Sequence, residues 1–322
     1  MPTILSGLVA RDELKKALVA KIAALQEKRG MPITLAIIQV GDRPDSTAYI
    51  NAKKRFAATI GVLVRLVHFN ESAGQEEIVA AIKALNAEKQ VSGIIVQLPL
   101  PEHFDEQAVL DAIDPAKDTD AISTARVKVW SVQRSDLCIN QDPILYPATA
   151  RGVGELLDFY HISLRDKRVC VIGRSNFVGT PIAALCRARG AHVTVCHSKT
   201  VDLVKETLAA DVIISAVGRA GLITAQHVKA GQVVIDVGIN EIFDQKAGEH
   251  GHEKTDRPIR HLVGDVDFKE ASSALGDSST GEKGAISPVP GGVGPMTVLG
   301  LFENLADCAT IELSVGVSVS RS

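Results

Sequence analysis

The chain has 322 residues, of which 46% are hydrophobic and 23% charged, and its formal net charge is −3. This composition is typical of a soluble globular protein that is large enough to form two domains. A near-neutral charge without a basic stripe argues against nucleic acid as the main partner. No apolar run approaches the roughly 20 residues that a membrane-spanning helix needs.

The cysteines and the N-terminal residues indicate a reducing compartment. Segment 1–16 lacks the basic and apolar regions of a secretory signal. The cysteines are odd in number, widely spaced and without a CxxC pair, which is typical of buried thiols: Cys138, Cys170, Cys186, Cys196 and Cys308. We therefore expect a cytoplasmic protein.

Helical and strand patterns alternate in the N-terminal part of the chain. The strands are nearly continuous apolar runs, which is typical of a parallel sheet covered on both faces. In chain order the patterns predict a helix at 10–29, a strand at 32–40, a helix at 46–60, a strand at 62–69, a helix at 75–88 and a strand at 93–97.

A second alternating series follows a segment without clear periodicity at 122–147. It comprises a helix at 150–161, a strand at 168–172, a helix at 177–189, a strand at 192–196, a helix at 200–208, and strands at 212–215 and 233–237. Segments 243–260 and 270–284 are polar and indicate surface insertions, and a last helix is expected at 298–310. We therefore predict an N-terminal domain at 1–145, completed by 298–322, and a second domain at 146–297.

The segment Gly173–Gly179 has the position of a dinucleotide-binding turn, because it follows an apolar strand and opens a helix. Its spacing departs from GxGxxG: Ser175 takes the place of the second glycine, and the last glycine comes one residue late. A tight turn without a ligand stays open as an alternative.

The end of the next strand favours NADP over NAD. An NAD site usually has an acidic residue there to hold the ribose, whereas this chain has His197-Ser198-Lys199-Thr200. Cationic and hydroxyl groups suit a 2′-phosphate, and Arg174 could supply a further cation. The alternative is that these residues only cap the following helix.

Tyr49 and Lys53 lie four residues apart on a predicted helix and therefore share one face. Such a pair can stack on a flat ligand and handle protons, provided that burial lowers the pKa of the lysine. The cationic run Lys53–Arg55 is, however, more typical of a solvated face. Gln97 ends a strand, at the edge where α/β sheets bind ligands.

Two further polar groups are weaker candidates. Asp118 and Asp120 are paired carboxylates beside a loop, a pattern that more often makes a turn than a site. His250 and His252 lie in a predicted insertion without a third ligand at usable spacing, so we expect no metal site.

The segment Pro288–Thr297 (PVPGGVGPMT) contains three glycines and three prolines. Such a loop can bring its backbone close to a flat ligand or to another backbone segment. Thr297 is the expected N-cap of the last helix. A plain connector before this helix is the alternative.

The order of these motifs resembles the bifunctional methylenetetrahydrofolate dehydrogenase/methenyltetrahydrofolate cyclohydrolase family over nearly the whole chain. VQLPLP and PVPGGVGPMT are highly specific to that family. The motifs are Tyr49-x3-Lys53, Val96–Pro101, Lys117–Asp120, Gly173-Arg174-Ser175, His197-Ser198, Val237–Asn240, Gly264–Phe268 and Pro288–Thr297.

The resemblance implies a homodimer of two-domain α/β monomers, with a catalytic domain, a Rossmann-type NADP-binding domain and a cleft between them. It implies oxidation of 5,10-methylenetetrahydrofolate with NADP⁺ and hydrolysis of the methenyl product to 10-formyltetrahydrofolate. These are reactions of one-carbon metabolism that serve purine biosynthesis.

The resemblance also assigns site residues. Lys53 would be the key catalytic residue, with Tyr49 packed on the folate rings, Gln97 bonded to Lys53, and Asp120 on the polar edge of the pterin. Other substrate contacts would be Val96, Leu98, Pro290, Gly291, Gly292, Val293 and Gly294. The cofactor positions would be Gly173, Arg174, Ser175, Ser198 and Ile239.

Two motifs depart from the family pattern. Ala121 stands where the motif KDVDGF has its glycine, and segment 147–152 reads PATARG where the family has PCTPxG. Two alternatives therefore stay open: an enzyme with only one activity, or a degenerate paralogue that binds folate or nucleotide without catalysis.

Overall fold

The structure is a computed structural model that describes residues 1–132, 144–244, 259–276 and 283–319. The chain divides into two compact units. The first unit comprises Ala10–Gly152 and Thr297–Ser322, and the second comprises Met1–Val9 and Val153–Met296. The division falls within three helices: α1 (Gly7–Arg29), α6 (Ala148–Phe159) and α10 (Val293–Val319).

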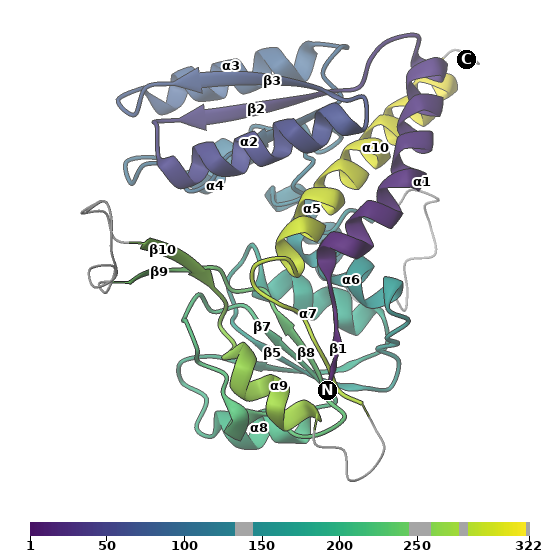
Figure 1. Cartoon of the computed structure of the whole chain (residues 1–322). Helices are drawn as coiled ribbons and strands as arrows, with labels where there is room; N and C mark the ends of the chain where they lie inside the picture. The colour runs from purple at the N-terminus through teal and green to yellow at the C-terminus, as the bar shows by residue number, and fades with distance from the viewer. Residues whose placement is uncertain (133–143, 245–258, 277–282, 320–322) are drawn as a thin grey trace, which may run out of the picture. The chain divides into compact units, whose positions relative to one another are not determined.

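The first unit is built on a parallel sheet with the strand order β3-β2-β4. The middle strand β2 (Thr34–Val40) is buried along nearly its whole length, because its apolar run can pack on both faces. Strand β4 (Gly93–Val96) is buried as well, whereas the edge strand β3 (Leu63–Phe69) mixes half-buried and exposed positions. The connecting helices are α2 (Pro44–Thr59) and α3 (Gln75–Ala87), as Figure 1 shows.

Helices α1 and α10 lie side by side in the first unit (Figure 1). Lys21 pairs with Asp307, and Arg29 pairs with Glu312 at 3.0 Å. Two short helices follow β4, namely α4 (Glu106–Leu110) and α5 (Thr124–Ser131). None of the helices in the described ranges combines the length and apolar character that crossing a bilayer requires.

The second unit is built on a sheet in which all paired strands are parallel, in the order β1-β11-β8-β7-β5-β6. Helices α8 (Leu203–Ala209) and α9 (Phe268–Gly276) cover one face, which carries a continuous apolar core. The other elements are α7 (Gly179–Ala188), a 3₁₀ turn (Ala225–His227), β1 (Thr3–Ile4), β5 (Arg168–Ile172), β6 (His192–Cys196), β7 (Val212–Ser215), β8 (Val233–Asp236) and β11 (Ala285–Ile286).

This topology confirms the predicted fold class of two α/β domains built on parallel sheets. The carboxyl ends of β5, β6, β7 and β8 meet at one edge of the second sheet, where open α/β sheets bind ligands. The domain bounds 1–145, 146–297 and 298–322 stay a prediction.

Several predicted elements were wrong in extent or type. Residues 245–258 of the insertion predicted at 243–260 lie outside the described ranges, and its two ends belong to strands β9 (Asn240–Asp244) and β10 (Ile259–Val263), which form an antiparallel pair. The predicted insertion 270–284 begins within helix α9. Helix α10 begins at Val293, so Thr297 is not its N-cap. Pro295 lies in its first turn, where a missing N–H costs nothing.

Candidate active site

Lys53 and Gln97 form a hydrogen-bonded pair in the first unit. Lys53 lies on α2, and its Nζ donates to Oε1 of Gln97 at 2.9 Å. Gln97 directly follows β4, and its backbone N–H donates to the carbonyl of Ile38 at 2.8 Å. Its side-chain Nε2 donates to the carbonyl of Leu98, also at 2.8 Å. Because the amide nitrogen is already bonded to the Leu98 carbonyl, the amide oxygen faces the ammonium group of Lys53.

Burial shifts the pKa values of both Lys53 and Asp120. The side chain of Lys53 keeps some solvent contact, but burial lowers its pKa, and the charge of Asp120 opposes that shift. Burial raises the pKa of Asp120 to about 6, against the opposing effect of Lys53. A lysine with a depressed pKa next to a carboxyl group that titrates near neutrality can take up and return a proton.

Asp118 shapes the loop that presents Asp120. Its buried carboxylate accepts hydrogen bonds from the backbone N–H groups of Ala121 and Ser123, each at 2.9 Å. Ala121 has a φ of 55°, a left-handed conformation that favours glycine. The departure from KDVDGF therefore places an alanine Cβ where the backbone conformation suits glycine better.

Asn304 holds the same loop from helix α10. It is wholly buried, and its Nδ2 donates to the carbonyl oxygens of Thr119 at 2.9 Å and Tyr146 at 2.8 Å. Its Oδ1 accepts from Nη1 of Arg151 at 2.9 Å. Sequence reasoning missed this residue. The available signal was a polar side chain within the apolar stripe of the last helix.

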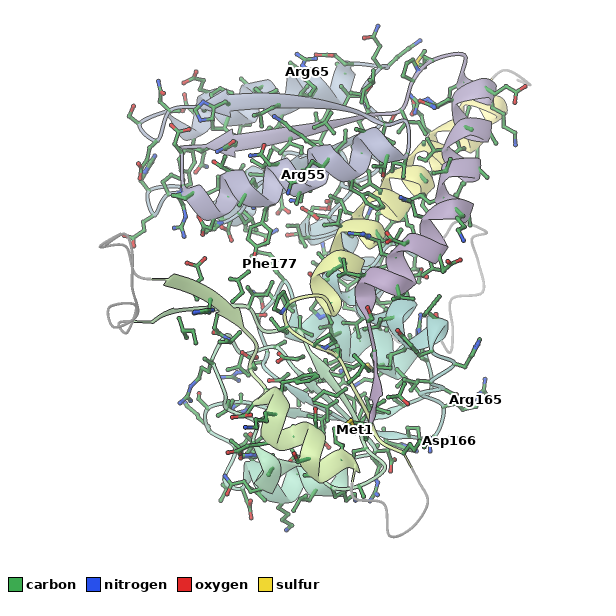
Figure 2. All side chains as sticks on the ribbon, in the orientation of Figure 1. Met1, Arg55, Arg65, Arg165, Asp166 and Phe177 are labelled. Carbon is green, nitrogen blue, oxygen red and sulfur yellow. The ribbon has the colours of Figure 1, made fainter. Side chains whose placement is uncertain are left out.

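Tyr49 precedes Lys53 by one turn of α2, and 46% of the residue is exposed. The cationic run is split, because Lys53 donates to Gln97. Arg55, which is labelled in Figure 2, is exposed on the same helix. The solvated-face interpretation was therefore wrong for Lys53. Of the other predicted substrate contacts in this unit, Val96 is buried and Leu98 half-buried.

The turn Gly173–Gly179 lies in the second unit, between β5 and α7. Gly173 has a φ of +113°, and a Cβ there would lie 2.3 Å from the carbonyl oxygen of Ala216. A Cβ on Gly179 would lie 2.2 Å from the carbonyl oxygen of Gly173. Gly179 therefore lets the helix approach the turn, as the last glycine of a dinucleotide fingerprint does, although it comes one residue later. Ser175 accepts a bond from the Gly179 N–H at 3.3 Å.

The exposed Ser198 follows β6, the strand next to β5 in the sheet. Its loop is braced internally, since the N–H of His197 donates to Thr200 Oγ1 at 2.9 Å and the N–H of Lys199 donates to His197 Nδ1 at 3.1 Å. Helix α8 is capped by Asp202 instead. The helix-capping alternative for this loop was therefore wrong.

Arg174 and Ile239 complete the predicted cofactor positions. Arg174 is exposed in the turn after β5, and Ile239 is 43% exposed after β8. A guanidinium group and a hydroxyl group after two adjacent strands suit a 2′-phosphate, and a turn that opens a helix suits a pyrophosphate. The donors in this unit therefore fit a dinucleotide phosphate of the NADP type.

The segment Pro290–Gly294 also belongs to the second unit, where it packs against the chain's own backbone. A Cβ on Gly7 would lie 1.8 Å from the carbonyl oxygen of Gly292, and the N–H of Leu8 donates to the carbonyl of Gly291 at 3.2 Å. A Cβ on Gly292 would lie 2.4 Å from the carbonyl oxygen of Pro288, whereas one on Gly294 would meet nothing within 4 Å. Contact between backbone segments, one of the two uses left open by the sequence, therefore accounts for Gly292 but not for Gly294.

Some predicted residues lie outside the described ranges, including His250, His252 and Cys138. The other four cysteines are free and buried, as the sequence predicts: Cys170, Cys186, Cys196 and Cys308.

Two family models match the chain. The catalytic domain of tetrahydrofolate dehydrogenase/cyclohydrolase matches residues 5–120, and the NAD(P)-binding domain of the same family matches residues 147–313. The bifunctional protein FolD of Bacillus licheniformis is 39% identical over 314 residues, which are 97% of this chain and 99% of that protein.

Solved structures agree with these matches. The bifunctional FolD dehydrogenase/cyclohydrolase of Campylobacter jejuni is 37% identical with a TM-score of 0.83, covering 96% of this chain and 99% of that one. The Trypanosoma brucei enzyme, solved with NADP cofactor and an inhibitor, is 33% identical with a TM-score of 0.84, covering 97% and 99%.

The fold and the site together define a two-domain enzyme with a lysine-bearing catalytic unit and a nicotinamide-nucleotide unit. The chain belongs to the tetrahydrofolate dehydrogenase/cyclohydrolase family, which confirms the resemblance seen in the sequence.

Proposed function

We propose that this chain oxidises 5,10-methylenetetrahydrofolate to 5,10-methenyltetrahydrofolate with NADP⁺ and hydrolyses that product to 10-formyltetrahydrofolate. The main observation in support is the hydrogen bond from Lys53 to Gln97, which lies in the part of the chain that matches the family's catalytic domain. The expectation of a bifunctional oxidoreductase and hydrolase of one-carbon folate metabolism is confirmed by both family domains and by the bifunctional relatives.

Lys53 is the proton-handling group of this proposal. As water adds to the methenyl carbon, its neutral amine accepts one proton of that water, and it returns this proton to N5 of the folate as the C–N5 bond breaks. The remaining hydroxyl proton is released to solvent as the formyl carbonyl forms. A depressed pKa supports this role, because an ordinary lysine remains charged at neutral pH. Gln97 positions the amine through its amide oxygen.

Tyr49 and Asp120 would orient the substrate. The exposed ring of Tyr49 lies on the Lys53 face of α2 and offers a surface for the flat pterin. Asp120 would accept hydrogen bonds from the pterin edge. Val96, Leu98 and Pro290–Gly294 remain proposed substrate contacts on the family resemblance.

The residues proposed to hold NADP⁺ are those of the glycine turn and the β6 loop. Gly173 and Ser175 would admit the pyrophosphate, Arg174 and Ser198 would bind the 2′-phosphate, and Ile239 would contact the remaining half of the cofactor. NADP⁺, when bound, supplies the acceptor for the hydride of the one-carbon bridge. The expected NADP cofactor is confirmed by the NAD(P)-binding domain and by the NADP-bound relative.

A homodimer, a cytoplasmic location and a contribution to purine biosynthesis are further proposals on the family resemblance. Light scattering on the purified protein tests the first: a mass near twice 34.2 kDa supports a dimer, and a mass near 34.2 kDa contradicts it.

A degenerate paralogue is not favoured. The residues assigned to proton handling are present and lie together, and Ala121 keeps the backbone conformation that the family glycine suits.

Methenyl-folate absorbance tests the function directly. Mixing the protein with 5,10-methylenetetrahydrofolate and NADP⁺ should give a methenyl signal that rises and then decays, with a smaller signal for NAD⁺. The absence of any signal with both cofactors would contradict the dehydrogenase, and a signal that does not decay faster than in buffer would contradict the cyclohydrolase.

A further inference from the structure

Asp265 is a wholly buried carboxylate between strand β10 and helix α9 of the second unit. It accepts five hydrogen bonds from neutral donors. Oδ2 accepts from Ser215 Oγ at 3.1 Å and from the N–H groups of Val217 at 2.7 Å and Gly218 at 3.3 Å, and Oδ1 accepts from the Arg219 N–H at 2.8 Å and Asn240 Nδ2 at 3.1 Å. Such a set of donors compensates the burial of a charge.

These donors come from the two segments that leave β7 and β8. Ser215 ends β7, and Val217–Arg219 is the exposed segment that follows it. Asn240 begins β9 directly after Ile239. Asp265 therefore ties together two segments at the carboxyl edge of the sheet, where α/β sheets bind nucleotides.

The first of these segments touches the dinucleotide turn. A Cβ on Gly173 would lie 2.3 Å from the carbonyl oxygen of Ala216, the residue before Val217. The conformation of Val217–Arg219 is thus coupled to the turn on one side and to Asp265 on the other.

Asp265 is held in turn by backbone and by a second carboxylate. Asp236 accepts from the N–H groups of Asp265 at 3.0 Å and Val266 at 2.9 Å. A Cβ on Gly238 would lie 2.1 Å from Oδ1 of Asp265, and one on Gly264 would lie 1.7 Å from Oδ2 of Asp236. Only glycine fits at positions 238 and 264. The close approach of these two backbone segments fixes the position of the Asp265 carboxylate.

We propose that Asp265 is a positioning residue for the cofactor: it holds Val217–Arg219 and Asn240 in the conformation that receives the nicotinamide half of NADP⁺. This inference rests on the proposed function. Ser198, on the β6 side of the glycine turn, is assigned to the 2′-phosphate, so the β7–β8 side is left for the other half of a dinucleotide.

Asp265→Asn is the sharpest probe because it changes almost no volume. Both oxygens of Asp265 face donors, so an amide nitrogen in either place meets N–H or O–H groups and leaves them unpaired. We expect the dissociation constant of NADP⁺, measured by titration calorimetry, to rise at least about tenfold. The cyclohydrolase rate, which needs no NADP⁺, should stay within about twofold of wild type, because Lys53 belongs to the other unit.

Asp267→Ala is the matched control. Asp267 lies two residues further on and accepts from the Glu270 N–H at 2.9 Å at the start of α9. Its loss should lower thermal stability and leave NADP⁺ affinity unchanged. A merely structural role for Asp265 predicts that both variants lose the same functions in the same proportion.

Ser215→Ala is a milder second variant that keeps the test decisive if Asp265→Asn does not fold. It removes one donor to Asp265 from a buried residue outside the segments that receive the cofactor, and it should weaken NADP⁺ binding about threefold or more without slowing the cyclohydrolase. Wild-type NADP⁺ affinity in both variants, or in Ser215→Ala when Asp265→Asn does not fold, overturns the inference. Failure of the wild-type chain to bind NADP⁺ overturns the proposed function instead.

Discussion

The amine of Lys53 donates to the amide oxygen of Gln97 at 2.9 Å, across 44 residues of sequence and between helix α2 and the end of strand β4. The amide fixes where the amine points, and its oxygen can stabilise the charged form. Burial lowers the pKa of Lys53, and the charge of Asp120 opposes that shift. These opposing effects together set the protonation of Lys53.

Substitutions at Gln97 should move the pH profile of the cyclohydrolase in opposite directions. Gln97→Glu places a negative charge beside the amine, which raises the pKa of Lys53, so the acidic limb moves to higher pH and the rate at pH 7 falls about tenfold or more. Gln97→Met removes the acceptor and should move that limb to lower pH. Decay of methenyl absorbance between pH 5 and 9 measures both, and shifts in the same direction contradict the assigned role.

Ala121→Gly should leave stability nearly unchanged, although Ala121 is wholly buried. Glycine relieves about 1–2 kcal/mol of left-handed strain at a φ of 55° but loses a buried methyl and gains chain entropy on unfolding. Ala150→Gly is the control, because Ala150 is equally buried in the right-handed helix α6 and should cost about 1–2 kcal/mol. Urea unfolding measures the free energy of unfolding of both variants. Equal losses in the two variants would contradict the proposed strain at Ala121.

Arg151→Ala should destabilise the first unit by about 1–3 kcal/mol, because it removes a cation shared by two carboxylates of low exposure, although Asp307 keeps its pair with Lys21. Arg151 pairs with Glu303 at 2.9 Å and Asp307 at 2.6 Å, and the Asp307 side chain is only 8% exposed. Arg11→Ala breaks the more exposed pair with Asp12 and should cost less than about 1 kcal/mol. Thermal unfolding measures both variants, and an equal fall in melting temperature for Arg151→Ala and Arg11→Ala would refute this prediction.

Asp236 should make the free energy of unfolding fall as pH rises toward neutrality, because burial raises the pKa of this carboxyl group to about 7. The folded state holds this proton more tightly than the unfolded chain, whose aspartate pKa is about 3.9. The resulting stabilisation is fully present below about pH 4 and is lost as pH rises through about 7.

Asp236→Asn mimics the protonated form and should flatten the decline of the denaturant midpoint between pH 5 and 8. Asp267→Asn, at the start of α9, should keep the wild-type slope. A slope that is unchanged in Asp236→Asn would remove Asp236 as its source.

The sequence predicted best those elements that depend on local pattern. Strands β5 and β6 fall within their predicted bounds because they are short apolar runs between polar turns. Helix α9 was missed because its single amphipathic stretch lies in a polar segment, and the start of α10 was misplaced because Pro295 and its neighbouring glycines resemble a loop.

The site could be predicted only where a motif carried it. Lys53 and Tyr49 share a helical spacing, and the family motifs add Gln97 and Asp120. The roles of Asn304 and Asp265 depend on contacts across 153–185 and 25–50 residues, respectively, and no local pattern encodes such partners.

The most direct test of the account is the fate of the methenyl species in Lys53→Met with NADP⁺ and 5,10-methylenetetrahydrofolate. Methionine keeps the length and packing of the side chain but cannot accept a proton. We expect methenyl absorbance to rise and then persist in this variant, with decay no faster than in buffer, while the wild-type signal decays. Decay at the wild-type rate in Lys53→Met would contradict it.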